Sequence, residues 1–178
     1  MQIKLPEGVV GRALFSDDKV YRYSLIRRWR EGKGTAIFIM LNPSTADEST
    51  NDPTVNRCML WAMRNGYRRL VILNAFALRS TDPKALAKHA DPVGPTNDET
   101  ILHALNTAQI GLDAIDGGRY IVICGWGTHG ALLDRGSKIK KLLTDHGYVP
   151  HVFATTMAGH PGHPLYIKNE DMKPRIWK

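Results

Sequence analysis

The sequence lacks any apolar run near the roughly 20 residues that a membrane-spanning helix needs, and no charged-then-apolar leader opens it. It also has only two cysteines, Cys58 and Cys124, which lie far apart. Cys124 ends an apolar run and Cys58 falls in a helical pattern, so we expect buried free thiols rather than a disulfide. These absences argue against a membrane helix and a disulfide framework. They predict a cytoplasmic protein that makes no membrane contact.

Several motifs that bind metals or cofactors are absent as well. His160 and His163 are three residues apart, but Pro161 and Gly162 between them exclude a regular helical pair. Neither cysteine lies in a zinc-type spacing. The glycines around Trp126 form neither a Walker loop nor a dinucleotide-binding fingerprint. We therefore expect neither a bound metal nor a cofactor.

Composition is that of an ordinary globular protein with a basic balance. The 178 residues are 43% hydrophobic and 23% charged, which suits one domain with a buried core. Lys and Arg number 24 against 17 Asp and Glu, which gives a net charge of +7. This excess favours polyanionic partners, because each phosphate contact releases condensed counterions. A charged, solvated surface explains the same balance, so charge alone leaves a nucleic-acid or nucleotide partner open and indicates no oligomeric state.

The N-terminal part predicts a β-hairpin. Residues 9–15 and 20–29 have strand-like patterns, and Ser16-Asp17-Asp18-Lys19 between them suits a turn. The basic run Arg27-Arg28-Trp29-Arg30 predicts a solvated edge.

The rest of the chain alternates strand and helix. Apolar runs at 35–41, 69–76, 120–124 and 150–154 are typical of strands covered on both faces. A helix begins at Asp52-Pro53, where Asp52 can cap the free amides, and stops at Asn65-Gly66. Further helices are expected at 80–88, around 101–108 and at 137–146. We therefore expect residues 1–178 to form a single α/β domain, with three α/β/α layers, a mostly parallel central sheet and the N-terminal hairpin.

Polar loops follow each expected core strand. In such sheets the strand-to-helix loops gather at one edge, and ligands bind beyond the carboxyl ends of the strands. Side chains far apart in the sequence therefore converge there. The candidate catalytic residues are Asn42, Asp52 and His163, and the candidate substrate-binding residues are Pro43, Ser44, Asn74, Trp126, Gly127 and His160.

Each of these residues also has a purely structural interpretation. Asn42 before a proline can orient a water or a base edge, or simply close a strand in an Asx-Pro turn. Asp52 can cap its helix, face the crevice, or do both. Asn74 interrupts an apolar strand, so its amide needs hydrogen bonds, either from a neighbouring loop or from a nucleobase. His163 suits an anion or leaving group, and Trp126 is either core or a stacking platform.

These motifs resemble a known family. The stretch from Phe38 to Ala46 (FIMLNPSTA), Asn51-Asp52-Pro53-Thr54, Leu73-Asn74, Trp126-Gly127 and His163-Pro164-Leu165 closely resemble the domain-of-unknown-function 1643 family. The resemblance spans nearly the whole chain. It identifies relatives without implying a reaction.

The order of the loops is also similar to that of the uracil-DNA glycosylase superfamily. Asn42-Pro43, Asn74, Trp126-Gly127 and His163-Pro164-Leu165 match its motifs in order and strand context. The resemblance implies a uracil-DNA-glycosylase-like fold, in which Asn42 positions the attacking water, Asn74 reads the base and His163 stabilises the departing base. On duplex DNA such a reaction requires base flipping and a plug for the vacated stack. Leu165-Tyr166 fits the start of a strand as well as a wedge.

Three function classes follow from these expectations. The first is an enzyme acting at a nucleobase or its N-glycosidic bond, in DNA or in a free nucleotide. The second is a non-catalytic nucleic-acid or modified-base binding module, and the third an enzyme for an unrelated small phosphorylated or nucleotide-like metabolite.

Overall fold

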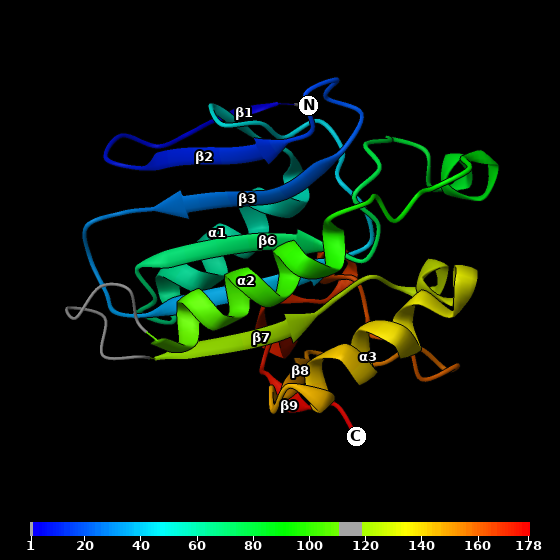
Figure 1. The fold of residues 1–178 in the computed structure, drawn as a ribbon. Helices are drawn as coiled ribbons and strands as arrows, with labels where there is room; N and C mark the ends of the chain where they lie inside the picture. The colour runs from blue at the N-terminus through cyan, green and yellow to red at the C-terminus, as the bar shows by residue number, and fades with distance from the viewer. Residues whose placement is uncertain (1, 111–118) are drawn as a thin grey trace.

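The protein is an α/β structure built on a seven-stranded mixed sheet, with a separate two-stranded sheet beside it (Figure 1). The computed structural model describes residues 2–110 and 119–178. The large sheet has the order β2-β3-β6-β4-β7-β8-β9, and the small one pairs β1 with β5. The strands are β1 (Ile3–Lys4), β2 (Val10–Phe15), β3 (Arg22–Arg28), β4 (Thr35–Met40), β5 (Thr50–Asn51), β6 (Arg69–Asn74), β7 (Tyr120–Cys124), β8 (Pro150–Val152) and β9 (Arg175–Ile176).

The four expected core strands are confirmed as a parallel set. The order β6-β4-β7-β8 is parallel throughout, whereas β2, β3 and β9 pair antiparallel. The expected N-terminal hairpin is β2–β3, and it extends this sheet because β3 also pairs with β6. The sheet is therefore mixed, with its parallel part in the middle.

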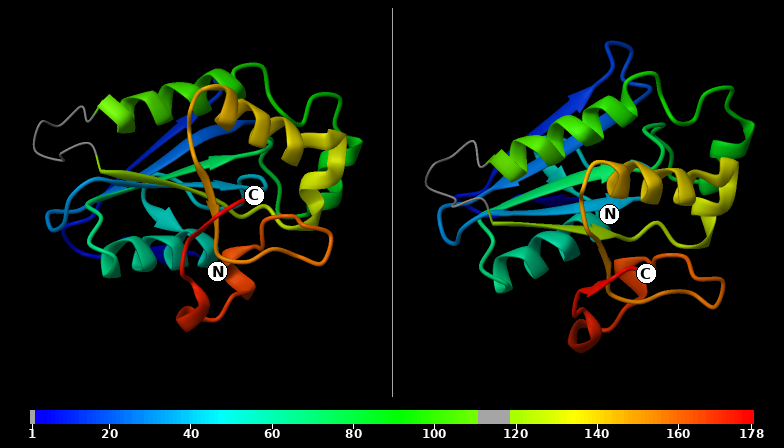
Figure 2. Two further views of the ribbon diagram at one scale, coloured as in Figure 1. Left: turned by 90° about the horizontal axis from the view of Figure 1, so that it is seen from below. Right: turned by 60° about the horizontal axis from the view of Figure 1, so that its bottom comes forward.

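Helices cover both faces of the sheet (Figure 2). α1 (Pro53–Arg64) lies on one face, and α2 (Asn97–Ile110) and α3 (Arg135–Asp145) lie on the other. On the α1 face Phe38, Met59 and Ile72 belong to one buried cluster. On the opposite face Ile39 and Leu105 belong to a second one. Alternate residues of the core strands feed the two clusters, as the pleat of a strand requires.

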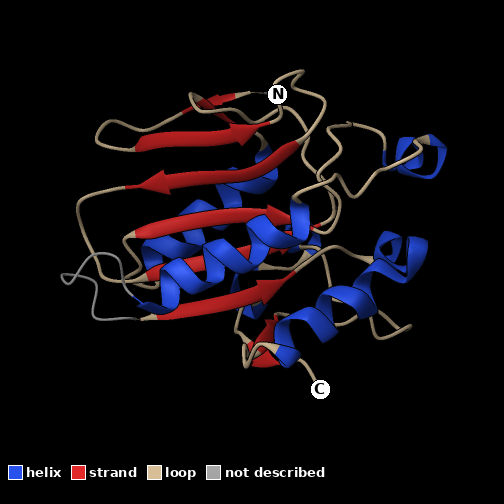
Figure 3. Ribbon diagram, in the orientation of Figure 1, coloured by secondary structure: helices blue, strands red, loops and turns tan. Residues whose placement is uncertain are grey.

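Local signals account for the helix ends. Asp52 accepts a hydrogen bond from the Val55 amide at 2.8 Å, and Pro53 occupies the first helical turn of α1. The part of the chain that the structure describes also contains four short 3₁₀ helices, of which η1 and η2 lie beyond the carboxyl ends of β6 and β7 (Figure 3). They are η1 (Pro83–Lys88), η2 (Thr128–Asp134), η3 (Pro164–Tyr166) and η4 (Asn169–Asp171).

The expectation of a solvated edge at residues 27–30 is wrong for two of its members. Trp29 is buried, and Arg27 is fully buried although charged. β3 has neighbours on both sides, so this run is not an edge of the sheet. Arg27 tolerates burial because its guanidinium donates to the Asn51 side chain at 2.8 Å and to the carbonyls of Asp47 and Thr50. Only Arg28 and Arg30 of the run are exposed.

Both cysteines are free and buried, as expected, and burial raises the pKa of each thiol. Within residues 2–110 and 119–178, none of the helices is both long enough and apolar enough to cross a membrane.

Candidate functional site

A cavity of about 660 Å³ opens at the carboxyl ends of the parallel strands. Its floor includes Met40 and Ile72 of the α1-side cluster, so it lies on the α1 face of the sheet. This is where open α/β sheets bind ligands, and the volume suits a small organic ligand. The polar residues around it that carry the argument below are Arg22, Asn42, Asp52, Asn74 and His163.

Most of the predicted site residues gather in this one cavity, and two do not. Its walls contain Asn42, Ser44, Asp52, Asn74, Trp126, Gly127 and His163. Pro43 is buried outside the lining, where its carbonyl accepts the Ser80 amide at 2.9 Å. His160 instead lines a separate hollow with Lys140 and Trp177. The loop folds back between Thr155 and Pro161, which separates His160 from His163.

Asn74, the last residue of β6, presents an unpartnered amide to the cavity. Its side chain is 1% exposed, and neither Nδ2 nor Oδ1 has a hydrogen-bond partner. A buried amide without partners costs about 1–3 kcal/mol per group relative to one that is satisfied. The expected alternative, that this amide pins a neighbouring loop, is therefore wrong.

The backbone at the end of β6 is held firmly. Asn97 donates from Nδ2 to the carbonyls of Asn74 at 3.0 Å and Ala75 at 3.2 Å. Arg135 donates from Nε to the Ala75 carbonyl at 2.6 Å, and its guanidinium is ion-paired with Asp98. These contacts come from α2 and α3. They fix the backbone at the end of β6 and leave the side-chain amide of Asn74 without a hydrogen-bond partner.

Asn42 has a structural role that involves only half of its amide. Its Nδ2 donates to the carbonyls of Pro43 at 3.0 Å and Ser80 at 2.9 Å, with a longer contact to Leu78 at 3.4 Å. These bonds join the β4–β5 loop to the β6–η1 loop. Its Oδ1 remains an acceptor that can orient a water molecule.

Asp52 caps α1 and also lines the cavity. Only its Oδ1 is engaged as a cap, by the Val55 amide. Its carboxylate acts on two titratable groups of the site, Arg22 and His163. Burial lowers the pKa of both Arg22 and His163, and the Asp52 charge partly opposes that effect in each.

His163 lies in the wall as a neutral imidazole. Burial lowers its pKa below the usual 6.5. Its Nδ1 accepts the Leu165 amide at 3.3 Å, so the proton of the neutral ring sits on Nε2. That leaves one N–H donor for a ligand. Leu165 and Tyr166 form the 3₁₀ helix η3 rather than a strand, and both are exposed at the cavity mouth.

Trp126 is a core residue, not a stacking platform. Its side chain is 1% exposed and its ring meets Trp177 edge-on at 5.4 Å between centroids. Gly130 packs so closely that a Cβ there would lie 2.1 Å from Trp126 Cδ1. Tyr166, which also lines the cavity, is 85% exposed and so offers its ring to a planar ligand.

Sequence reasoning missed Arg22, which also lines the cavity. The only signal was a lone arginine in the strand-like stretch at 20–26.

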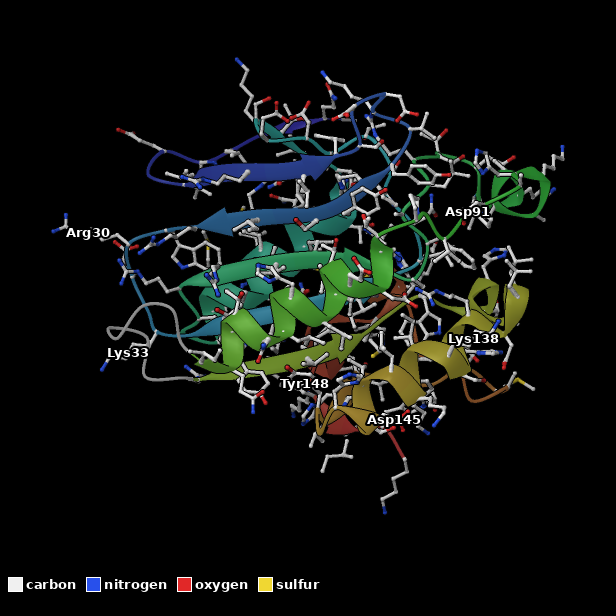
Figure 4. All side chains as sticks on the ribbon, viewed as in Figure 1. Arg30, Lys33, Asp91, Lys138, Asp145 and Tyr148 are labelled. Carbon is white, nitrogen blue, oxygen red and sulfur yellow. The ribbon has the colours of Figure 1, made fainter. Side chains whose placement is uncertain are left out.

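The basic residues are not all at the cavity end of the sheet. In Figure 4, Arg30 and Lys33 project from one end of the sheet, and Asp91 lies at the other end. Across the two described ranges, no three His, Cys, Asp or Glu side chains gather as a metal site would require.

Comparison with known proteins identifies a family for this chain. A family model described as "Protein of unknown function (DUF1643)" matches residues 22–165. No curated protein and no solved structure matches the chain. The matched stretch contains all five of the polar cavity residues named above, from Arg22 to His163. The chain therefore belongs to the DUF1643 family.

Proposed function

We propose that the protein recognises a nucleobase and hydrolyses its N-glycosidic bond, in DNA or in a nucleotide, with a uracil-DNA-glycosylase-like arrangement of residues. The observation that carries this proposal is Asn74, whose amide donor and acceptor are both buried, unpartnered and in the cavity wall. A carboxamide of this kind pairs with the adjacent N–H and carbonyl of a base. Binding such a base would satisfy both atoms at once.

The other polar residues of the wall support a hydrolytic step. Water oxygen bonds to C1′ of the sugar as the C1′–N bond breaks, and the electron pair leaves with the base. Asp52 takes the proton of the water, which Asn42 orients through Oδ1. His163 donates from Nε2–H to the oxygen on which the charge of the base develops. The base leaves as its anion and takes up a proton from solvent, and Asp52 returns the proton of the water to solvent.

Base release is the direct test. The protein is incubated with uracil- and modified-base oligonucleotides, single-stranded and duplex, and then with alkali, while free nucleosides are followed by chromatography. We expect base release by the native protein and its loss in Asn74→Leu and His163→Leu. The controls Asn106→Ala and His103→Ala change exposed residues of α2 and should retain it. Absence of strand breaks and of free base across the whole panel would contradict the proposal.

The second candidate is a non-catalytic base-binding module. It is favoured because two of the candidate catalytic residues already have structural roles. Asn42 Nδ2 joins two loops, and Asp52 Oδ1 caps α1. It predicts salt-dependent binding without turnover. Base-selective affinity that survives Asn42→Ala and His163→Ala would support this candidate over the enzyme.

A further inference from the structure

Arg22 reaches the cavity because of a β-bulge in β3. Leu14 pairs with Ser24, but the next residue, Phe15, pairs with Arg22, so Tyr23 is an extra residue on β3. Neighbouring residues of β2 point to opposite faces, and their partners Ser24 and Arg22 therefore do so too. Without the bulge these two would share a face. Bulges of this kind redirect side chains next to binding sites.

The guanidinium of Arg22 is buried but poorly satisfied. Arg22 is 1% exposed, its Nη1 donates to the Ala46 carbonyl, and its Nε has no partner. Arg27, on the same strand, is equally buried, yet its guanidinium donates to four acceptors. Arg27 is thus a structural arginine. Arg22 has unused donors at the edge of a cavity.

The charges around Arg22 act on it in opposite directions. Asp52 and Asp47 attract it, whereas Arg79 and Arg27 repel it, so the neighbouring groups supply no net negative charge. Burial, partly offset by Asp52, lowers the pKa of Arg22 to about 10.

We propose that Arg22 binds an anionic oxygen group of the ligand, a phosphate or a carboxylate, at the β3 side of the cavity. This inference rests on the proposed function and narrows its substrate to an acidic nucleotide or an acidic base. Asn74 reads the amide edge of the base, and Arg22 compensates the negative charge through charge-assisted hydrogen bonds. A neutral nucleoside would leave the unused N–H donors of Arg22 without a charged acceptor.

Binding of matched neutral and anionic probes tests the proposal. Calorimetric titration compares deoxyuridine with deoxyuridine 5′-monophosphate, and uracil with orotate, its carboxylate derivative. We expect the anionic member of at least one pair to bind about tenfold or more tightly. A gain with the monophosphate identifies a phosphate, and a gain with orotate identifies a carboxylate. Equal affinities within both pairs, or no binding by either anion, would overturn the inference.

Substitutions test whether Arg22 causes the tighter binding of the anionic probe. Arg22→Met should abolish the anion preference, and Arg22→Lys should retain part of it. Arg12→Gln is the matched control, because it removes the same charge from an exposed residue of β2 outside the cavity lining and should leave the preference intact. A preference that survives Arg22→Met, or that disappears in Arg12→Gln alone, contradicts the assignment.

A measurement on the native protein covers the case in which Arg22→Met does not fold. The arginine Nε–Hε NMR signal that Arg22→Lys removes should shift when the preferred anion is added; an unshifted signal contradicts the inference. The readouts also separate the two proposals. Base release without any anion preference overturns only this inference, whereas Arg22-dependent anion binding without base release overturns only the hydrolytic function.

Discussion

Asn97 donates from Nδ2 to the backbone carbonyl of Asn74 at 3.0 Å, so the first residue of α2 fixes the backbone of the last residue of β6. Both side chains are buried, but only Asn97 has its amide nitrogen engaged. The contact keeps the carbonyl of Asn74 occupied and its side chain available. Asn97 therefore positions the backbone of Asn74.

This relationship makes Asn97 important for stability. Asn97→Ala removes the donor to two buried carbonyls, and we expect it to lower the free energy of unfolding by about 1–3 kcal/mol. Urea denaturation measures the change. Asn106→Ala, an exposed position of the same helix, should stay within about 0.5 kcal/mol of the native protein. Equal effects at the two positions would show that the Asn97 bonds contribute nothing.

Asn74 should behave in the opposite way. Asn74→Leu replaces two unpartnered buried polar atoms with an apolar side chain of similar size, next to an apolar floor that includes Ile72. We expect the free energy of unfolding to stay constant or to rise by up to about 3 kcal/mol. Binding of base-containing ligands should be lost. Denaturation and calorimetric titration are run on the same sample, and a strongly destabilised variant would mean that the amide has a structural partner.

The parallel core of this fold could be predicted because its strands are buried on both faces. The runs Thr35–Met40, Arg69–Asn74 and Tyr120–Cys124 are almost entirely apolar, which distinguishes them from amphipathic strands. The start of α1 could be predicted for a different reason. Asp52 and Pro53 act on neighbouring backbone groups, so the signal is local.

Long-range pairing could not be predicted in the same way. The burial of Arg27 has no local signal, because its acceptors, Asn51 and the Asp47 and Thr50 carbonyls, lie 20 or more residues away. The orientation of Arg22 depends on the bulge against β2, which is a property of two strands together. The two-stranded sheet β1–β5 has no local signal for the same reason.

The candidate site was predicted where strand ends set the position of a residue. Asn42, Asn74 and Gly127 follow or end core strands, and all three line the cavity. His160 was misplaced because it lies in a loop whose course depends on its own hydrogen bonds. The Gly127 amide donates to the Pro161 carbonyl at 2.8 Å, which draws the end of that loop to the cavity and leaves His160 outside its lining.

His163 gives a pH dependence with a definite sign. Burial lowers its pKa in the folded protein below 6.5, so the unfolded chain takes up a proton first as the pH falls. Its contribution to stability is therefore fully present above pH 6.5 and is lost as the pH falls below that value. Protonation also removes the Nδ1 acceptor of the Leu165 amide, which adds to the loss of stability over the same range.

A non-titrating substitute tests this dependence. His163→Asn can keep an acceptor for the Leu165 amide without binding a proton, so its urea midpoint should vary less between pH 8 and pH 5. His103→Asn changes an exposed histidine and should keep the native profile. Parallel profiles for the native protein and His163→Asn would contradict the assignment.

Asp52 allows its two roles to be separated, because asparagine caps a helix about as well as aspartate but cannot accept a proton as a base. We expect Asp52→Asn to keep the helix cap, to lose the attraction between the carboxylate and the buried Arg22, and to lower base release by about 100-fold or more. Asp52→Ala should lose the activity and, relative to Asp52→Asn, about 1 kcal/mol more of stability, since the Val55 amide then has no acceptor. Asp82→Asn is the matched control, because Asp82 caps η1 through the Lys84 amide at 2.9 Å and lies outside the cavity lining. If Asp52→Asn releases base at the native rate, the carboxylate is only a cap, and the proton of the water must go elsewhere.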